Sequence, residues 1–244
     1  MDIHKPKPFH GLREFLVEIG TIVVGVLIAL AAEQAAEAVH WHYQAAQAEA
    51  AIGDELSADL AQMAEREFID PCIRKRIAEL RDKLLQPGTQ WKADPQILAD
   101  PPPTVLPSAY RTPDRLWLRN AWQTAVANDS VSHMSPDRAA IYGGTYRQVE
   151  HISDLQDSEF QAAQEMTALS YDLALSPDKR QDYLNTLGRL DALNDLIVAI
   201  SQQSLAHGAR IGLGPNKRAI AELFAAQRHY RGACVIDAKL PRVE

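Results

Sequence analysis

The two cysteines, Cys72 and Cys234, are the residues whose chemistry is most readily foreseen. If the segments that carry them are exported, the compartment is oxidising, and a disulfide would tie the second helical segment to the C-terminal tail. Closing so long a loop would stabilise the fold by up to roughly 4–5 kcal/mol in the chain-entropy treatment. The alternative is two separate buried thiols. Neither cysteine lies in a recognisable reactive motif, so a catalytic role is not indicated.

The histidines show no spacing typical of metal ligands. His40 and His42 flank Trp41, and residues two apart on a helix point in different directions. Four others are scattered through the chain and belong to no HExxH or CxxC motif: His133, His151, His207 and His229. We therefore predict no metal site and no bound cofactor.

Two further patterns give only weak signals of enzymatic chemistry. Residues 212–218 superficially suggest a phosphate loop, but they lack the GxxxxGK(S/T) spacing and no strand precedes them. We interpret them as a turn between helices. There is also no GxSxG elbow for a serine nucleophile. No residue is predicted to be catalytic, and we do not expect an enzyme.

The densest combination of aromatic and basic side chains is Arg115, Trp117, Arg119 and Trp122. These four side chains could hold a ligand through cation–π contacts. The alternative is that two tryptophans at helical spacing belong to the hydrophobic core. The group is therefore a candidate ligand cluster rather than a defined site.

Composition narrows the class of protein. The chain has 244 residues, of which 46% are apolar and 23% charged, which is ordinary globular composition. Its formal net charge is −7. An acidic balance argues against general nucleic-acid binding, which needs a basic face to neutralise phosphates. Frequent alanine and scarce glycine favour helices.

One segment, residues 15–37, is apolar enough to enter a membrane. Its charge-free core, residues 19–32, is shorter than the roughly 20 residues that cross the hydrocarbon layer. Apolar flanks lengthen it, so that residues 16–36 would measure about 30 Å as a helix. Glu18 and Glu33 would then lie near the two interfaces, where a carboxylate costs less than at the centre. We predict a transmembrane helix here.

The residues around this segment favour one orientation. Three cationic residues precede it: Lys5, Lys7 and Arg13. After it, the first lysine or arginine is Arg66, and this asymmetry places the N-terminus in the cytoplasm and the bulk of the chain outside. Trp41 and Tyr43 lie just beyond the span, where an outer aromatic belt would anchor it. The predicted location is the bacterial inner membrane, with a periplasmic C-terminal domain.

Two alternatives remain open for this segment. It could be a cleaved signal peptide, with residues 21–30 as the apolar region and residues 29–31 as the cleavage site, although Glu14 and Glu18 are unusual in such a leader. It could also be the core helix of a soluble protein, since its apolar run is short enough. The retained anchor explains the charge asymmetry best.

One face of the predicted span carries Thr21, Gly25 and Ala29, spaced by four residues. Small residues at this spacing let helix backbones approach closely in lipid. We therefore expect self-association or docking onto another membrane helix, with the lipid bilayer itself as the other partner. The alternative is that small residues are simply common in this segment.

The remaining pattern predicts an all-α chain in which the transmembrane helix continues into an extracytoplasmic helical bundle. We expect five segments. They are a cytoplasmic tail (1–14), the span (15–37), membrane-proximal helices (38–86), a Pro-rich linker (87–113) and a bundle that packs with the membrane-proximal helices (114–244). No stretch shows convincing strand alternation.

Capping signals set the expected helix starts. A new helix is expected to start at Asp70 and Pro71. Another is expected to start at Pro113 and Asp114, and its buried residues would be Leu116, Trp117, Ala121 and Trp122. Three further helices are expected after Ser135, after Ser176 and from Asn216 to Tyr230, the first of them running to about Leu175 with Phe160 on its buried stripe.

The N-terminal segments 5–8, 14–16, 18–20 and 25–30 read KPKP, EFL, EIG and GVLIAL. They resemble the N-terminus of a group of uncharacterised bacterial proteins that have one membrane helix and a helical body. The resemblance covers about the first 35 residues and implies topology only. It carries no activity and no functional residue.

These observations lead to one functional hypothesis and two alternatives. The chain is expected to be a membrane-anchored, non-enzymatic interaction protein, or an accessory subunit of a larger membrane assembly. The first alternative is an extracytoplasmic ligand-binding or sensory helical module, because bundles can hold ligands between helices. The second is an enzyme of unrecognised type, which a buried pocket with strongly perturbed titratable groups would revive.

Overall fold

The computed structural model describes residues 11–98, 107–237, 240 and 241. The structure is all-α, with five α-helices in this part of the chain: α1 (Leu12–Leu85), α2 (Asn120–Ala127), α3 (Pro136–Glu165), α4 (Pro177–Arg210) and α5 (Lys217–Arg231). Three single 3-10 turns accompany them: η1 (Ser130–His133), η2 (Thr167–Ser170) and η3 (Gly232–Cys234). Contrary to expectation, two short strands pair antiparallel: β1 (Gln90–Trp91) with β2 (Leu173–Ala174).

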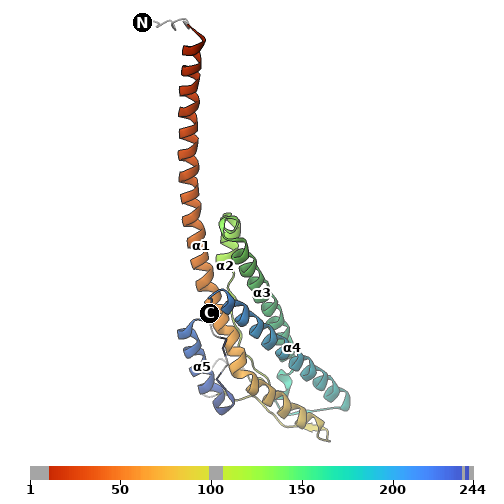
Figure 1. Cartoon of the computed structure of the whole chain (residues 1–244). Helices are drawn as coiled ribbons and strands as arrows, with labels where there is room; N and C mark the ends of the chain where they lie inside the picture. The colour runs from red at the N-terminus through yellow and green to blue at the C-terminus, as the bar shows by residue number, and fades with distance from the viewer. Residues whose placement is uncertain (1–10, 99–106, 238–239, 242–244) are drawn as a thin grey trace, which may run out of the picture.

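Helix α1 projects far beyond the rest of the protein (Figure 1). Every side chain from residue 11 to residue 40 is exposed. An 18-residue window of this helix has a mean hydropathy of 2.5, and none of it is buried, so the helix is long and apolar enough to cross a membrane. The core helix of a soluble protein would be covered by its own domain. Because the apolar stretch of α1 is exposed in the single chain, the structure contradicts the alternative that it is the core helix of a soluble protein. Lys5, Lys7 and most of the N-terminal tail lie outside the described residues.

The prediction of a new helix at Asp70 and Pro71 is wrong, because α1 continues through Pro71 to Leu85. Proline within a helix removes a backbone hydrogen bond and costs about 3 kcal/mol. Tertiary contacts compensate on both sides of it. Ile69 and Cys72 are buried, and the Asp70 carboxylate accepts hydrogen bonds from side chains instead of capping a helix.

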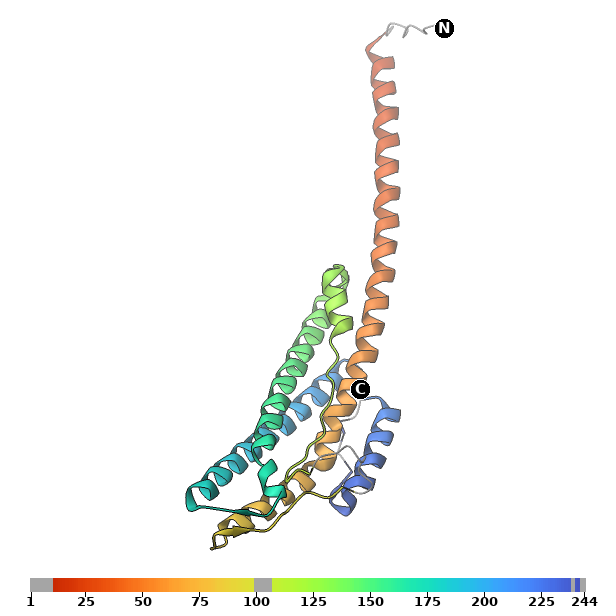
Figure 2. The ribbon, with the colours of Figure 1, turned by 180° about the vertical axis from the view of Figure 1, so that it is seen from behind.

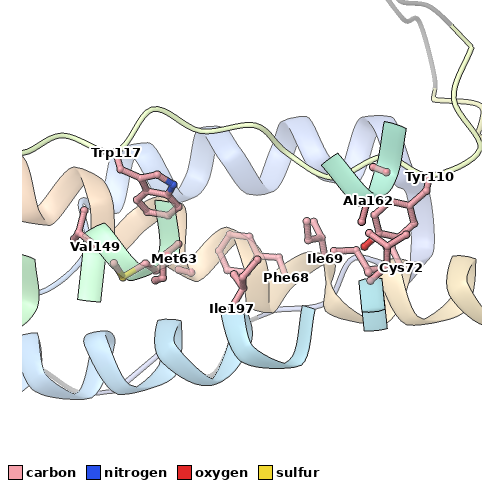
Figure 3. Close-up of a cluster of buried hydrophobic side chains, with 14 of the residues drawn as sticks. Met63, Phe68, Ile69, Cys72, Tyr110, Trp117, Val149, Ala162 and Ile197 are labelled. Atoms are coloured by element: carbon pink, nitrogen blue, oxygen red, sulfur yellow. The ribbon is translucent and has the colours of Figure 1, made fainter. Parts of the chain in front are cut away.

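The second half of α1 forms the centre of a helical body, which we define as residues 41–85 of α1 together with all later elements. Helix α4 packs along α1, α3 packs against α4, and α5 also contacts α1. Figures 1 and 2 show α3 and α5 on opposite sides of α1. The apolar cluster between these helices has Trp117 and Val149 at one end and Tyr110 and Cys72 at the other (Figure 3).

A largely extended segment, the strap, connects α1 to α2; it comprises the described residues 86–98 and 107–119. It runs back along the body beside α1 (Figure 2). Arg76 on α1 fixes it by donating from Nε to the carbonyl oxygen of Ala109 (2.8 Å) and from Nη2 to that of Asp94 (2.5 Å). The Pro101–Pro103 run of the predicted Pro-rich linker lies outside the described residues.

The helix predicted to open at Pro113 does not begin there, because residues 113–119 are not helical. The backbone N–H of Leu118 donates to the carboxylate of Asp59 on α1, at 3.2 Å. This N–H group is therefore paired with a side chain and needs no helical hydrogen bond. Leu116, expected in the core, is 78% exposed. Trp117 is buried as expected.

Three helix starts agree with their capping signals. The side chains of Ser135, Ser176 and Asn216 accept hydrogen bonds from backbone N–H groups at the starts of α3, α4 and α5. Helix α3 nevertheless ends earlier than expected, at Glu165, and Phe160 is 55% exposed rather than part of the core. The chain after it forms η2 and β2, because Leu175 N–H donates to the carbonyl oxygen of Thr89 in the strap (2.8 Å).

Candidate functional site

The predicted pairing of Cys72 with Cys234 is present as a disulfide. It joins the C-terminal part of α1 to η3, with a Cα–Cα distance of 5.1 Å and a sequence separation of 162 residues. Ile236 N–H also donates to the carbonyl oxygen of Phe68 (3.0 Å). The end of α5 is therefore held against α1 by a covalent bond and a backbone hydrogen bond.

Trp41 and Tyr43, predicted as interface anchors, occupy different environments. Tyr43 is 65% exposed. The Trp41 ring stacks on His133 of η1, with centroids 4.0 Å apart and planes 11° apart. Trp41 therefore contacts the body at the end nearest to the apolar stretch.

The small-residue stripe of Thr21, Gly25 and Ala29 is fully exposed on the projecting part of α1. The hydroxyl of Thr21 donates to the carbonyl oxygen of Val17 within the helix (2.9 Å). A Cβ atom added at Gly25 would meet nothing within 4 Å. The stripe is thus available to a neighbouring helix, and none of the described residues covers it.

The structure separates the two arginines of the Arg115, Trp117, Arg119 and Trp122 cluster. Arg119 forms an ion pair with Glu150 on the surface of the body (3.0 Å). Arg115 instead reaches into the body and makes two hydrogen bonds to the buried Glu65, at 2.6 and 2.5 Å. These partners direct the two guanidinium groups to different carboxylates.

The two tryptophans of this cluster also pack separately. Trp117 is buried in the core, whereas Trp122 stacks on Tyr146 of α3 with ring centroids 5.5 Å apart. A Cβ atom at Gly143 would lie 3.2 Å from the Trp122 ring, so the glycine permits this close packing of α2 on α3. The four residues therefore form no common ligand site.

A buried ion pair lies at the centre of the body. Arg66 on α1 donates from both Nη atoms to Glu159 on α3, each at 3.0 Å, and also from Nη2 to Asn194 on α4 (3.0 Å). The Tyr110 hydroxyl donates to the same carboxylate at 3.1 Å. Burial, with the negative charge of Glu159, raises the pKa of Tyr110 well above its ordinary value, so the phenol stays protonated.

A second polar chain begins at the neighbouring Glu65. Beside its pairing with Arg115, Glu65 accepts from Gln227 Nε2 on α5 (2.8 Å). Gln227 Oε1 in turn accepts from Arg231 Nε (2.7 Å), and Arg231 Nη2 donates to the carbonyl oxygen of Arg111 (3.1 Å). Burial lowers the pKa of Arg231 to about 10, with Arg66 adding to the effect, so its guanidinium still carries a charge at neutral pH.

A groove of about 590 Å³ opens beside this second chain, between the strap, α3 and α5. Its walls include Arg111, Arg115 and Arg231 as charged side chains, and Phe160 and Tyr230 as aromatic ones. Its volume lies within the ~300–1,000 Å³ typical of small-ligand pockets. A mixture of cations and apolar surface is suited to binding rather than to acid–base chemistry.

Asp59 is an acidic residue in an unusual environment, because its side chain on α1 is fully buried. Burial, opposed by the hydrogen bond from the Leu118 N–H and assisted by the negative charge of Glu55, raises its pKa to about 7. Its Oδ2 atom has no hydrogen-bond partner among the described residues. Asp59 therefore changes its charge near neutral pH inside the body.

The buried polar network was not predicted, although the sequence contains a signal for it. Asp59 and Arg66 fall three residues after Leu56 and Met63, so both charged residues lie on the apolar stripe of α1. Charged residues in such positions are usually paired when buried. Their partners lie up to 128 residues away in sequence, as for Arg66 and Asn194, and no local spacing reveals them.

Within the described ranges, no group of three or more histidine, cysteine, aspartate or glutamate side chains could hold a metal ion. Comparison with protein-family models, with curated proteins and with solved structures finds no match. Functional arguments for this chain therefore rest on its own geometry.

Proposed function

We propose that the protein is a membrane-anchored, non-enzymatic interaction protein, or an accessory subunit of a larger membrane assembly. The observation that carries this proposal is the continuity of α1. One unbroken helix of 74 residues has an exposed first part, residues 12–40, that carries the apolar stretch, and a later part that forms the core of the body. An apolar helix of this length needs lipid or another helix around it.

We place the N-terminus in the cytoplasm and the body in the periplasm of a bacterial inner membrane. Arg13 precedes the apolar stretch, and the next lysine or arginine is Arg66, which supports this orientation by the positive-inside rule. The Cys72–Cys234 disulfide supports an oxidising compartment for the body. Alkaline phosphatase fused after the C-terminus tests the orientation, because it is active only when exported. An inactive but stably expressed fusion would contradict the proposed orientation.

The rigid connection has a geometrical consequence for any partner. Trp41 lies five residues after Ala36, or about 8 Å along the helix axis, so the η1 end of the body would lie close to the membrane surface. With no flexible linker in between, the body would keep a fixed height and tilt relative to the span. A partner that binds both the span and the body would most simply be another membrane protein.

Purification of the full chain from native membranes in mild detergent, after cross-linking, tests the interaction. We expect a defined complex, either with another membrane protein or with a second copy. Gly25→Leu should reduce its recovery, since it fills the small-residue face, whereas Val26→Leu on a neighbouring position should not. Recovery of the unsubstituted protein as a lone monomer would count decisively against this function.

A second candidate function, an extracytoplasmic ligand-binding module, is favoured by one observation. The groove between the strap, α3 and α5 combines charged and aromatic walls and has the volume of a small-ligand site. A thermal-shift screen of small metabolites on the full chain tests it. A screen without any stabilising compound would contradict the ligand-binding function and leave the membrane interaction untouched.

A further inference from the structure

Helix α1 carries an apolar pattern that extends from the predicted span into the part of the helix beside the body. Two positions of each heptad, a and d, meet the partner helix in a coiled coil. Counted in heptads from Ile22, these positions hold only small or apolar residues. We call them the seam: Ile22, Gly25, Ala29, Ala32, Ala36, Val39, Tyr43, Ala46 and Ala50. A pattern sustained over about three to four heptads is typical of a coiled coil.

The part of the seam outside the lipid is the informative one, because nearly every register is apolar within the predicted span. Residues 33–50 include eight polar or charged side chains, and none of them is on the seam: Glu33, Gln34, Glu37, His40, His42, Gln44, Gln47 and Glu49. Val39 and Tyr43 are on it, and they are 57% and 65% exposed. Two large side chains about one turn apart are therefore left uncovered on the same face of α1.

The seam lies on the side of α1 that is turned away from the body. Ala45 and Ile52 are buried in the core of the body. Successive residues of an α-helix are about 100° apart around the axis, so both lie roughly 130–150° from the middle of the seam between Tyr43 and Ala46. Tyr43 and Ala46 are exposed accordingly. The body therefore leaves this face of the helix open to another molecule.

The open part of the seam ends at Ala50, which is exposed. At Gly53, an added Cβ atom would lie 3.9 Å from Leu213 in the turn before α5. One helical turn further, the Ser57 hydroxyl donates to the carbonyl oxygen of Gly214 (2.9 Å). The turn between α4 and α5 therefore covers this side of α1 beyond Ala50 and sets the limit of any pairing along the seam.

A second copy of this chain matches the seam in orientation and in height. Under the proposed topology every copy has the same span in the same orientation, so Val39 and Tyr43 of two copies lie at the same distance from the membrane. Parallel helices in register place each a residue against a and each d residue against d. The contact is then self-complementary, as a two-fold interface requires. No charged residue lies on the seam, so pairing brings no like charges together there.

We propose that α1 pairs with α1 of a second copy along the seam, so that the protein is a parallel homodimer in the membrane. The contact runs from Ile22 in the span to Ala50 beside the body and is about 42 Å long. Small residues let the two backbones approach closely, and the two Tyr43 rings add an aromatic contact outside the lipid. Because the seam faces away from the body, the two bodies lie on opposite sides of the pair. This inference rests on the proposed function and names its partner.

Disulfide cross-linking of the full chain in native membranes tests the proposal, with two differently tagged copies expressed together. The two native cysteines are bonded to each other, so a cysteine introduced on α1 is the only free thiol. We expect Val39→Cys and Ala46→Cys to give covalent dimers that carry both tags. Ala38→Cys is the matched control, because it is equally close to the membrane but lies off the seam. It should give less dimer by about tenfold.

A charge on the seam provides a second test that does not depend on thiol chemistry. Val39→Glu brings two carboxylates together between the helices and should reduce co-purification of the two tagged copies by about tenfold. Ala38→Glu adds the same charge at the neighbouring position and should leave co-purification unchanged. Both residues are exposed, so neither substitution disturbs the core of the body.

The possible outcomes separate this inference from the proposed function. Equal cross-linking of Val39→Cys and Ala38→Cys would overturn the seam as the interface. Recovery of the protein with a different membrane protein, and without a second copy of itself, would overturn the homodimer while the proposed function stands. Recovery of a lone monomer would overturn both.

Discussion

Arg66 on α1 and Glu159 on α3 form a two-pronged ion pair in the interior of the body, with both nitrogen–oxygen distances at 3.0 Å. Their side chains are 5% and 0% exposed. Because the same guanidinium also donates to Asn194 on α4, the pair connects three helices at one point. Pairs of this kind specify an arrangement more than they stabilise it, since desolvation offsets much of the attraction.

Removal of one partner should therefore be far more harmful than removal of both. We expect Glu159→Gln to lower the free energy of unfolding by about 3–5 kcal/mol, because it leaves the Arg66 charge uncompensated in the interior. Urea unfolding of the full chain in detergent, followed by tryptophan fluorescence, measures the change. Glu150→Gln on the same helix breaks the exposed pair with Arg119 and should change the value by less than about 1 kcal/mol. Equal effects of the two substitutions would show that the inner pair is not desolvated.

Asp59 should make the stability of the protein depend on pH. Its pKa in the folded protein is about 7, against an ordinary value of 3.8. Between these two values the unfolded chain loses a proton that the folded protein keeps, so stability falls as pH rises through this window. The total loss attributable to Asp59 is up to about 4 kcal/mol, and it is complete above pH 7.

Asp59→Asn isolates this contribution, because the amide retains an oxygen to accept from the Leu118 N–H but cannot ionise. We expect the variant to be more stable than the unsubstituted protein at pH 8 and close to it at pH 4. Urea unfolding over this pH range provides the comparison. Parallel pH profiles for the two proteins would contradict a raised pKa at Asp59.

The disulfide should contribute strongly to the stability of the body. Because it closes a loop of 162 residues, Cys72→Ser together with Cys234→Ser should lower the free energy of unfolding by roughly 2–5 kcal/mol. Thermal melting of the double variant and of the reduced original protein should give similar lowered midpoints. If the reductant lowers the midpoint of the double variant as much as that of the original, the effect does not come from this bond.

Helix starts were predictable where the signal is local. Ser135, Ser176 and Asn216 each bond the backbone of the next few residues, and three helices begin after them as their sequence indicates. The equally good local signals at Pro71 and Pro113 fail. In both places a contact from a distant segment decides the outcome, which local capping rules do not include.

The disulfide was predictable because two cysteines allow only one intramolecular pairing. The groove was not, because its walls come from segments that only the folded chain brings together. Arg111 on the strap, Phe160 on α3 and Arg231 on α5 show no shared spacing in sequence. The candidate ligand cluster of Arg115, Trp117, Arg119 and Trp122 was chosen because aromatic and basic residues are dense there in sequence. Of these four residues only Arg115 lines the groove.

Gly208 on α4 lies close to the turn that follows this helix and to Leu60 on α1. A Cβ atom at Gly208 would lie 2.8 Å from the carbonyl oxygen of Leu213 and 3.0 Å from Cδ1 of Leu60. The backbone oxygen cannot move without disturbing the turn into α5, so we expect Gly208→Ala to destabilise the protein by about 1–3 kcal/mol despite the better helix propensity of alanine. Gly188 lies on the same helix with nothing within 4 Å of an added Cβ atom, and Gly188→Ala should stabilise the protein by about 0.5–1 kcal/mol. Urea unfolding of both variants should give opposite signs, and a gain in stability at both positions would mean that the turn after α4 is not packed against Gly208.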